Sequence, residues 1–205
     1  MRLKNQLLFT LITLSASVHA QQVDHNDTGF YVGSEVGSTS VKSEYSAYTY
    51  RFPRSEYKQY SSKTTASSFG IYGGYRFTPY LGLESTLLAV PLNRGVSGNS
   101  SSDAALASLT ITPKVMVRTS KWLSVYGRAG IAISALCDAD SNDCWSGALK
   151  TGGIGAQFDL TDNVKIRVGY DITKGTIEKD LPSNNSINDI AISLNRLAAS
   201  VHYQF

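Results

Sequence analysis

The sequence lacks any apolar run long enough to cross a membrane as a helix. Such a helix needs about 20 consecutive apolar residues, so a helical membrane protein is excluded. Cysteine is scarce, because only Cys137 and Cys144 occur. In an exported chain, two cysteines so close together are expected to form a disulfide. An excess of one charge is also missing. Without Arg2 and Lys4 the formal charge of +3 falls to +1, and nucleic acid is not a predicted partner.

The first twenty residues have the features of an export signal. Arg2 and Lys4 form a basic start, residues 7–14 are largely apolar, and Val18-His19-Ala20 is a small-residue cleavage site. We therefore expect a signal peptide at residues 1–20, cleaved after Ala20, and a mature domain at 21–205. No cysteine follows the cleavage site, so a lipoprotein anchor is not expected.

Most of the remaining chain alternates polar and apolar residues with period two, which predicts β-strands. The connections between these strands alternate in length. Short turns are expected at Thr78-Pro79, 119–121 and 161–163, and long loops at about 38–67, 91–103, 137–144 and 173–189. Transmembrane barrels have short periplasmic turns and longer outer loops. The sequence therefore predicts an all-β fold, an eight-stranded antiparallel up-and-down transmembrane β-barrel, rather than a soluble β-sandwich.

The last strand and one proline carry further expectations. Val201, Tyr203 and Phe205 share the apolar face of a strand that ends on an aromatic residue. We expect this strand to pair with the first one and to be recognised by periplasmic chaperones and the barrel-assembly machinery. Pro113 falls inside the fourth strand, where a closed barrel offers no free edge for a missing N–H donor, so a β-bulge is expected there.

Several segments resemble the transmembrane domain of the OmpA family. They are GFYVG at 29–33, GGYRFTPYLGLE at 73–84, VYGRAG at 125–130, GAQFDLTDN at 155–163, RVGY at 167–170 and YQF at 203–205. The resemblance implies a location in the outer membrane of a Gram-negative bacterium, in contact with lipid and lipopolysaccharide. It does not include the family's peptidoglycan-binding domain, so tethering to the cell wall is not expected. The chain is similar instead to small barrel-only outer-membrane proteins.

Charged residues are predicted to line the lumen. The inward face of the strands includes Glu35, Arg76, Glu84, Lys114, Arg128 and Arg167, with Lys165, Asp171 and Arg196. An eight-stranded barrel is just wide enough for side chains to fill it, so these charges must pair or hold water. The OmpA resemblance places Glu84, Lys114, Arg128 and Arg167 on a lumenal salt-bridge cluster proposed in that family to act as a gate. Gln157 stands where that family has a further carboxylate. A static plug and a narrow gated channel for ions or small solutes both remain open.

The first long loop is the best candidate for an interaction surface. It interleaves tyrosines with basic residues, namely Tyr48, Tyr50, Arg51, Arg54, Tyr57 and Lys58. Aromatic and basic side chains together suit sugars, phosphates or a partner surface, such as a host or phage ligand. The alternative is that two strands extend beyond the membrane with a tyrosine-rich interfacial belt.

No catalytic, metal or cofactor site is predicted. The segment after Cys137 begins like a calcium loop, but Asp143 and Leu149 stand where that loop needs glycine and glutamate. Ser200 and His202 share a face, as in some hydrolases, yet they fall near the periplasmic rim with no identified acid partner. We expect a structural and surface-interaction role of the adhesion type, with a gated porin-like channel as the alternative.

Overall fold

In the computed structural model, eight strands in chain order form one closed antiparallel barrel. The structure describes residues 28–51, 54–92, 104–138, 144–179 and 189–205, and only the backbone at 45–51, 54–59, 138 and 179. The strands are β1 (Gly29–Arg51), β2 (Arg54–Thr78), β3 (Leu81–Leu92), β4 (Ala104–Arg118), β5 (Leu123–Asp138), β6 (Cys144–Asp159), β7 (Val164–Lys179) and β8 (Asp189–Gln204). The predicted eight-stranded up-and-down barrel is confirmed. Among the described residues, no helix has the length and apolarity needed to cross a membrane.

Three short turns, the start of β1 and the end of β8 lie at one end of the molecule, here called the turn end. The Thr78 hydroxyl accepts hydrogen bonds from the N–H groups of Tyr80 and Leu81, at 3.2 and 3.0 Å. The barrel closes because β8 pairs with β1, and the Phe205 N–H donates to the Phe30 carbonyl at 2.9 Å. Gly29, at the start of β1, has φ +124°, a conformation that side-chain-bearing residues rarely adopt. The predicted pairing of the last strand with the first is therefore present.

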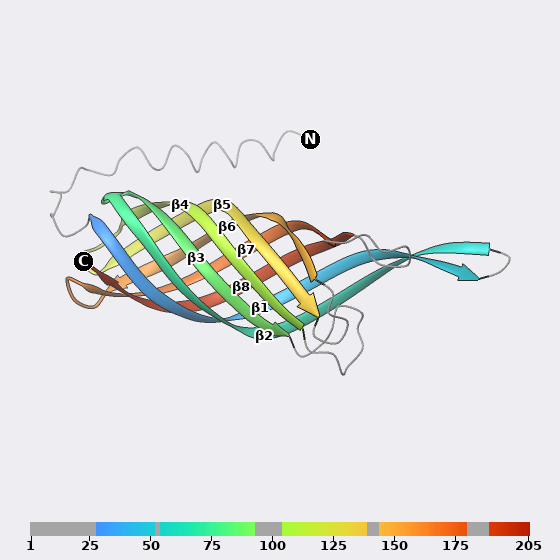
Figure 1. Cartoon of the computed structure of the whole chain (residues 1–205). Helices are drawn as coiled ribbons and strands as arrows, with labels where there is room; N and C mark the ends of the chain where they lie inside the picture. The colour runs from blue at the N-terminus through green and yellow to red at the C-terminus, as the bar shows by residue number, and fades with distance from the viewer. Residues whose placement is uncertain (1–27, 52–53, 93–103, 139–143, 180–188) are drawn as a thin grey trace, which may run out of the picture.

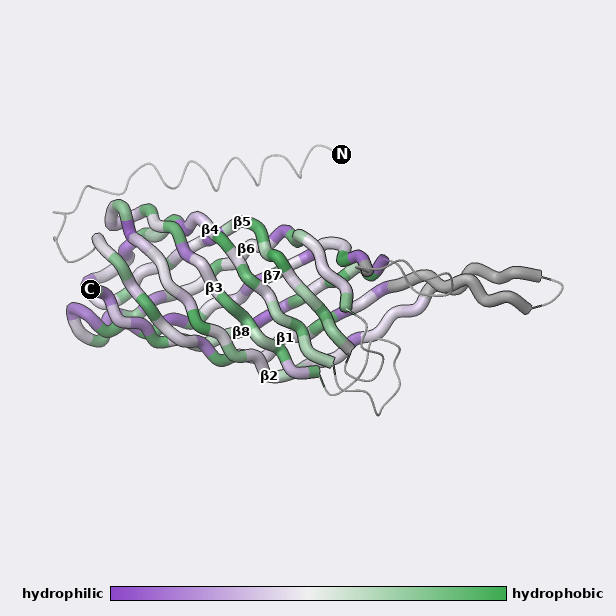
Figure 2. The backbone as a smooth tube through the Cα atoms, viewed as in Figure 1, coloured by the Kyte–Doolittle hydropathy of each residue, from purple (hydrophilic) through white to green (hydrophobic). Residues whose placement is uncertain are grey.

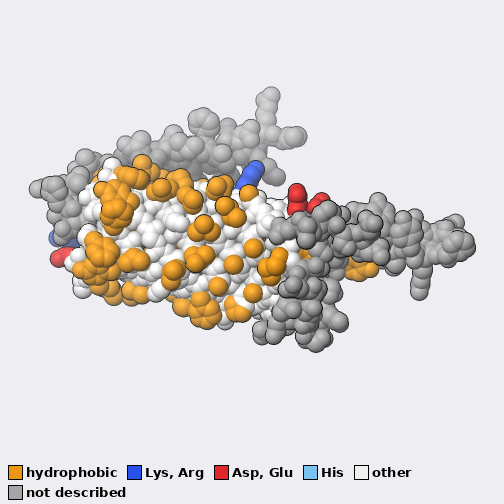
Figure 3. Space-filling view, viewed as in Figure 1, with side chains coloured by type: hydrophobic (Ala, Val, Ile, Leu, Met, Phe, Trp, Pro, Cys, Tyr) orange, Lys and Arg blue, Asp and Glu red, His pale blue; other side chains and the backbone are white. Residues whose placement is uncertain are grey.

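The predicted alternation decides which side chains face outward. In β1, Phe30, Val32 and Val36 are more than half exposed, whereas Tyr31 and Glu35 are buried. Figure 2 shows the mixture of hydrophobic and hydrophilic residues along the strands. On the face seen in Figure 3, apolar side chains are spread over the barrel wall, and the visible charged side chains lie towards its ends. We call this exposed apolar wall the apolar belt. At the turn end it includes exposed aromatic residues, namely Phe30, Tyr75, Phe77, Tyr80, Trp122, Tyr203 and Phe205.

The predicted first long loop is wrong for the residues described there. β1 and β2 stay paired from Gly29↔Arg76 to Arg51↔Arg54. Beyond Glu44, β1 no longer pairs with β8 in the described register, so the tips of β1 and β2 pair only with each other. They project well past the other strands (Figure 1). We call the paired backbone of residues 45–51 and 54–60 the arm, and the end of the barrel that carries it the arm end.

Two other expectations need correction. The loop expected from residue 173 begins later, because β7 continues to Lys179 and buries Thr173 and Ile177. The bulge expected at Pro113 is also absent. The β4–β5 register is unchanged between Ile111↔Ile131 and Lys114↔Arg128, and the ladder simply omits the pairs between them. The missing N–H of Pro113 thus interrupts the ladder without shifting it.

The arm end of the lumen is apolar, which the sequence did not predict. Side chains from the strand ends opposite the short turns pack into one buried cluster. We call it the apolar plug; it comprises Val41, Leu88, Val90, Leu92, Ala104, Leu106, Ala132, Leu136, Trp145, Leu149, Ile177, Ile190, Ile192 and Leu194. The charged residues of the lumen are therefore confined to the part nearer the turn end.

Candidate functional site in the barrel lumen

Glu84 is the centre of a charge network that crosses the lumen. Its side chain, on the inward face of β3, is fully buried. Arg167 from β7 donates to Glu84 Oε2 at 2.5 Å, and Arg128 from β5 pairs with Oε1. The Lys114 ammonium from β4 lies 3.4 Å from Oε2, and the Tyr31 hydroxyl from β1 donates to the same oxygen at 2.9 Å. One carboxylate thus joins four other strands across the barrel interior.

Asp171 is a second carboxylate centre that was not included in the predicted cluster. Arg128 donates to it twice, from Nε at 2.9 Å and from Nη2 at 2.7 Å. Arg196 from β8 donates to Asp171 at 2.9 Å and also pairs with Glu35. Asp171 and Arg196 were expected to face inward, but only the register of β5 to β8 brings them beside Arg128, because Arg128 is opposite Gly153 and Gly153 is opposite Asp171. The charge network therefore consists of Glu35, Glu84, Lys114, Arg128, Arg167, Asp171 and Arg196.

Gln157 and Arg76 lie nearer the turn end. The amide of Gln157 donates to Asp159 at 3.2 Å, and Asp159 also pairs with Lys165 at 3.2 Å and Arg118 at 3.1 Å. Gln157 therefore belongs to a separate group of polar residues at this rim. Arg76 is buried, with Nη2 at 3.6 Å from Met116 Sδ.

Aromatic rings hold the cations of the network in place. The Lys114 ammonium lies between the rings of Tyr31 and Tyr126, at 5.1 and 4.9 Å from their centroids. The Arg167 guanidinium lies 4.0 Å from the centroid of Tyr72. Such cation–π contacts stabilise a desolvated cation and add to its ion pairs. Inward glycines leave room for these rings: a Cβ at Gly155 would lie 2.5 Å from the ring of Tyr126.

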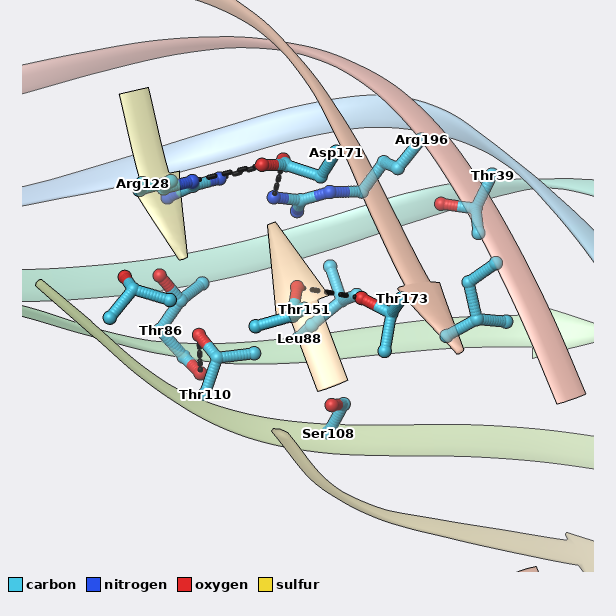
Figure 4. Close-up of a pocket in the computed structure, with 12 residues that line it drawn as sticks. Thr39, Thr86, Leu88, Ser108, Thr110, Arg128, Thr151, Asp171, Thr173 and Arg196 are labelled. Atoms are coloured by element: carbon cyan, nitrogen blue, oxygen red, sulfur yellow. Dashed lines mark hydrogen bonds and ion pairs between the residues drawn. The ribbon is translucent and has the colours of Figure 1, made fainter. Parts of the chain in front are cut away.

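A small polar cavity separates the charge network from the apolar plug. It has a volume of about 30 Å³ and is lined by Arg128, Asp171 and Arg196 on one side, and elsewhere mainly by threonines. Figure 4 shows the Arg128–Asp171–Arg196 group and the hydrogen bond between Thr151 and Thr173, whose hydroxyls lie 2.8 Å apart. The volume is enough for one or two water molecules. Leu88 and Leu194 also line it and belong to the apolar plug.

The structure places Ser200 and His202 in the lumen but joins them through a tyrosine. The Tyr72 hydroxyl donates to Ser200 Oγ at 3.3 Å and lies 3.1 Å from His202 Nδ1. Ser200 Oγ also accepts a hydrogen bond from Arg167 at 3.2 Å. Its hydroxyl oxygen is therefore part of the packing around the charge network. Among the described residues, no group of His, Cys, Asp and Glu side chains could hold a metal ion.

The remaining predicted site residues lie at the two ends. Cys137 and Cys144 form the expected disulfide, between the end of β5 and the start of β6. Val201, Tyr203 and Phe205 face outward at the turn end. Tyr48, Tyr50, Arg51, Arg54, Tyr57 and Lys58 belong to the arm, where the backbone is paired; their side chains lie outside the described part of the structure.

Comparisons with solved structures support the fold. Neisserial surface protein A is 17% identical, with a TM-score of 0.62 over 86% of this chain and 97% of that chain. AlkL, solved in lipid bilayers, is 13% identical, with a TM-score of 0.60 over 91% and 94%. OprG from Pseudomonas aeruginosa is 14% identical, with a TM-score of 0.56 over 86% and 96%. At these identities the likeness concerns the fold alone.

The family is established by sequence. No curated protein matches the chain. A family model described as the outer membrane protein beta-barrel domain, however, matches residues 8–205, nearly the whole sequence. The chain therefore belongs to the outer membrane protein β-barrel family, and its location is the outer membrane of a Gram-negative bacterium.

Proposed function

We propose that the protein is a non-enzymatic outer-membrane barrel that presents the arm at the cell surface for attachment to anionic glycans. The observation that carries this proposal is the arm itself. β1 and β2 are 23 and 25 residues long, whereas β3 has 12. Short turns face the periplasm in barrels of this kind, so the arm projects outside the cell. An isolated two-stranded hairpin is marginally stable in water, so the arm adds little to the stability of the protein. An interaction role would explain why the arm is present.

The composition of the arm and its base suggests the chemistry of the ligand. Residues 45–63 contain four basic side chains, Arg51, Arg54, Lys58 and Lys63, and one acidic residue, Glu56. Five tyrosines occur in the same segment. Basic side chains attract sulfate, phosphate or carboxylate groups, and aromatic rings stack on sugars and cations. We therefore propose that the ligand of the arm is a sulfated or phosphorylated surface glycan.

A gated channel is the alternative function, and the lumen argues against it. Ion pairs across the charge network block the half of the barrel near the turn end. The apolar plug fills the half near the arm end. A solute would therefore have to displace both a buried set of ion pairs and a packed hydrocarbon core.

The protein's route to the membrane is also part of the proposal. Residues 1–20 would direct export and be removed after Ala20, leaving 21–205. The β8 strand, with Val201, Tyr203 and Phe205 facing outward, would be presented to periplasmic chaperones and the assembly machinery. The apolar belt then lies in contact with outer-membrane lipid.

Retention of cells on immobilised heparin, a sulfated glycan, tests the proposal. Cells expressing the protein are compared with cells expressing a triple variant, Arg51→Gln, Arg54→Gln and Lys58→Gln. The triple variant should reduce retention to the level of cells without the protein. Lys121→Gln, which removes a cation from the opposite rim, should leave retention unchanged. Equal retention by the wild type and the triple variant would remove the basis for an anionic ligand.

A further inference from the structure

Two lysines face each other directly on the outside of the barrel. Lys150 of β6 and Lys174 of β7 are register partners, and both are exposed. Directly opposed residues in a sheet have Cβ atoms about 4.5–5.5 Å apart, and like charges in that position are destabilising. Among the described side chains, neither lysine has an ion-pair partner. An anion from outside the chain would relieve this repulsion.

The register continues the row of lysines around the barrel. Lys174 is opposite Ser193 of β8, Ser193 is opposite Lys42 of β1, and Lys42 is opposite Lys63 of β2. Lys42 is already paired with Glu44, at 2.6 Å. The Lys150–Lys174 pair is therefore the part of the row with the least compensated charge.

The lysine pair lies at the outer boundary of the apolar belt. On β7 the outward residues Val168, Tyr170 and Ile172 precede Lys174. Ile166, near the turn end of the same strand, lies eight residues before Lys174. At about 3.3 Å per residue and a strand tilt of about 40°, this corresponds to a height of roughly 20 Å. The belt of a membrane barrel is about 25 Å tall, so the two ammonium groups lie at the headgroup level of the outer leaflet.

A shallow apolar hollow, open to the outside, lies on the barrel wall across β4 to β8, nearer the turn end than the lysine pair. It has a volume of about 730 Å³, and its walls include Val125, Ile154, Val168 and Tyr170. Gly127, on the outward face of β5, also lines it. Ile154 and Tyr170 are register partners, as are Lys150 and Lys174, which lie four residues nearer the arm end on each strand. The hollow thus includes part of the pair of strands that carries the cations.

The backbone does not require the glycines on this surface. A Cβ at Gly127 would have its nearest neighbour at 4.0 Å, and one at Gly152 its nearest at 3.5 Å. Both are ordinary van der Waals distances. Inward glycines differ, because a Cβ at Gly153 would lie 2.0 Å from Asp171 Oδ1. Glycine at 127 and 152 therefore keeps space free outside the barrel.

From these observations we propose that the outer face of β5–β7 is a binding site for lipopolysaccharide. A phosphate group of the lipid A headgroup binds between Lys150 and Lys174, and an acyl chain occupies the hollow over Gly127. The outer leaflet is the reason for choosing this lipid, since lipopolysaccharide is its phosphorylated component. The proposal is independent of any ligand of the arm.

Native mass spectrometry of protein purified from outer membranes tests the site. Bisphosphorylated lipid A and phosphatidylglycerol are added separately, and retention of one lipid per barrel is measured as detergent rises. The wild type should retain lipid A in preference to phosphatidylglycerol. The double variant Lys150→Gln, Lys174→Gln should bind lipid A about tenfold more weakly, because two charge-assisted contacts to phosphate are lost. Lys121→Gln, at the opposite rim, should bind as the wild type does.

A second pair of variants tests the hollow without changing charge. Gly127→Val places a side chain in the hollow and should weaken lipid A retention. Gly73→Val is the matched control, because Gly73 faces outward on β2 and its Cβ would also meet nothing closer than 3.5 Å. Heat-dependent gel mobility verifies that each variant is folded. Unchanged lipid A retention in the lysine double variant, equal retention of both lipids, or equal effects of the two valines would each overturn the site.

Discussion

The contacts of Glu84 join several strands, and they could not be identified from the alternating pattern of β3 by itself. Its carboxylate accepts from Arg128, Arg167, Lys114 and Tyr31, which come from four different strands. Burying these cations is favourable only while the carboxylate compensates them. Removing one partner of a buried ion pair leaves an uncompensated charge, whose cost exceeds the net contribution of the pair itself.

Replacing Glu84 with glutamine should therefore lower the free energy of unfolding by about 3–5 kcal/mol. Urea unfolding in lipid vesicles, followed by tryptophan fluorescence, measures the change. Glu178→Gln is the control, because Glu178 is exposed on the outer face of β7. It should change stability by less than about 0.5 kcal/mol. Similar stabilities for the two variants would mean that the charge network is not a structural element.

Gly130 shows how the barrel accommodates Pro113. The β4–β5 ladder is interrupted at Pro113, and Gly130 lies on β5 across this interruption. A Cβ at Gly130 would lie 2.1 Å from the Ile111 carbonyl oxygen and 3.0 Å from the Thr112 Cα. Both neighbours are backbone atoms, so they cannot move aside without distorting β4.

Gly130→Ala should consequently destabilise the protein by about 1–3 kcal/mol, the usual effect of overpacking. Gly127→Ala, three residues earlier on the same strand, should be neutral or slightly stabilising, since glycine in a strand is entropically unfavourable. Parallel urea titrations of both variants give the comparison. An equal loss of stability in both would contradict the close approach of β4 to Gly130.

At the scale of elements, β1 and β2 divide into two parts with different surroundings. Their turn-end parts belong to the closed barrel, where β1 also pairs with β8 as far as Glu44 and β2 also pairs with β3 from Phe69 onward. Beyond Glu44↔Ser61 the described backbone pairs only within the hairpin. The barrel should therefore not depend on the arm for its stability.

Deleting residues 45–60 and joining Glu44 to Ser61 through Asn-Gly tests this independence. Asn-Gly suits a two-residue hairpin turn, and the Glu44↔Ser61 register already brings the two ends together. The shortened protein should fold as efficiently as the wild type and keep its heat-dependent gel shift. Failure to fold would show that the arm contributes to barrel assembly, and would count against a purely surface role.

At the scale of the whole molecule, the lumen is closed by two different kinds of barrier in series. The charge network is polar, and replacing one of its members weakens it. The apolar plug has no charged member, and a packed apolar constriction excludes ions by remaining dry. Loosening the first barrier therefore leaves the second in place.

In planar lipid bilayers the wild-type protein should show no discrete conductance steps, and Glu84→Ala should be equally silent. Single-channel recording measures this, with a gel-shift assay on the same sample to verify folded protein. Discrete openings that change on Glu84→Ala would instead support the gated-channel alternative and assign the charge network to a gate.

Features that depend on the residues of one strand could be predicted from the sequence, whereas contacts between strands could not be predicted in this way. Strand number, the three short turns and the facing of residues such as Glu84 and Val36 follow from local alternation, and they were predicted. The three cationic partners of Glu84 were predicted only through a family resemblance, and neither Tyr31 nor Asp171 was included. The inward position of the plug residues within 88–92 and 104–106, on either side of the loop expected at about 91–103, was not predicted, because apolar residues next to a loop do not indicate which face they take.

The sequence by itself determined the closed barrel and the inside or outside position of most side chains. The reason is that successive residues of a strand point to opposite faces, whatever their neighbours are. The tertiary structure alone decided which inward residues meet. That depends on the stagger between strands, which brings Asp171 to Arg128 and Arg196, opposes Lys150 to Lys174, and stacks the apolar plug above the charge network. Stagger is set by hydrogen bonds between neighbouring strands and by the connections that join them, and a period-two pattern within one strand contains no information about it.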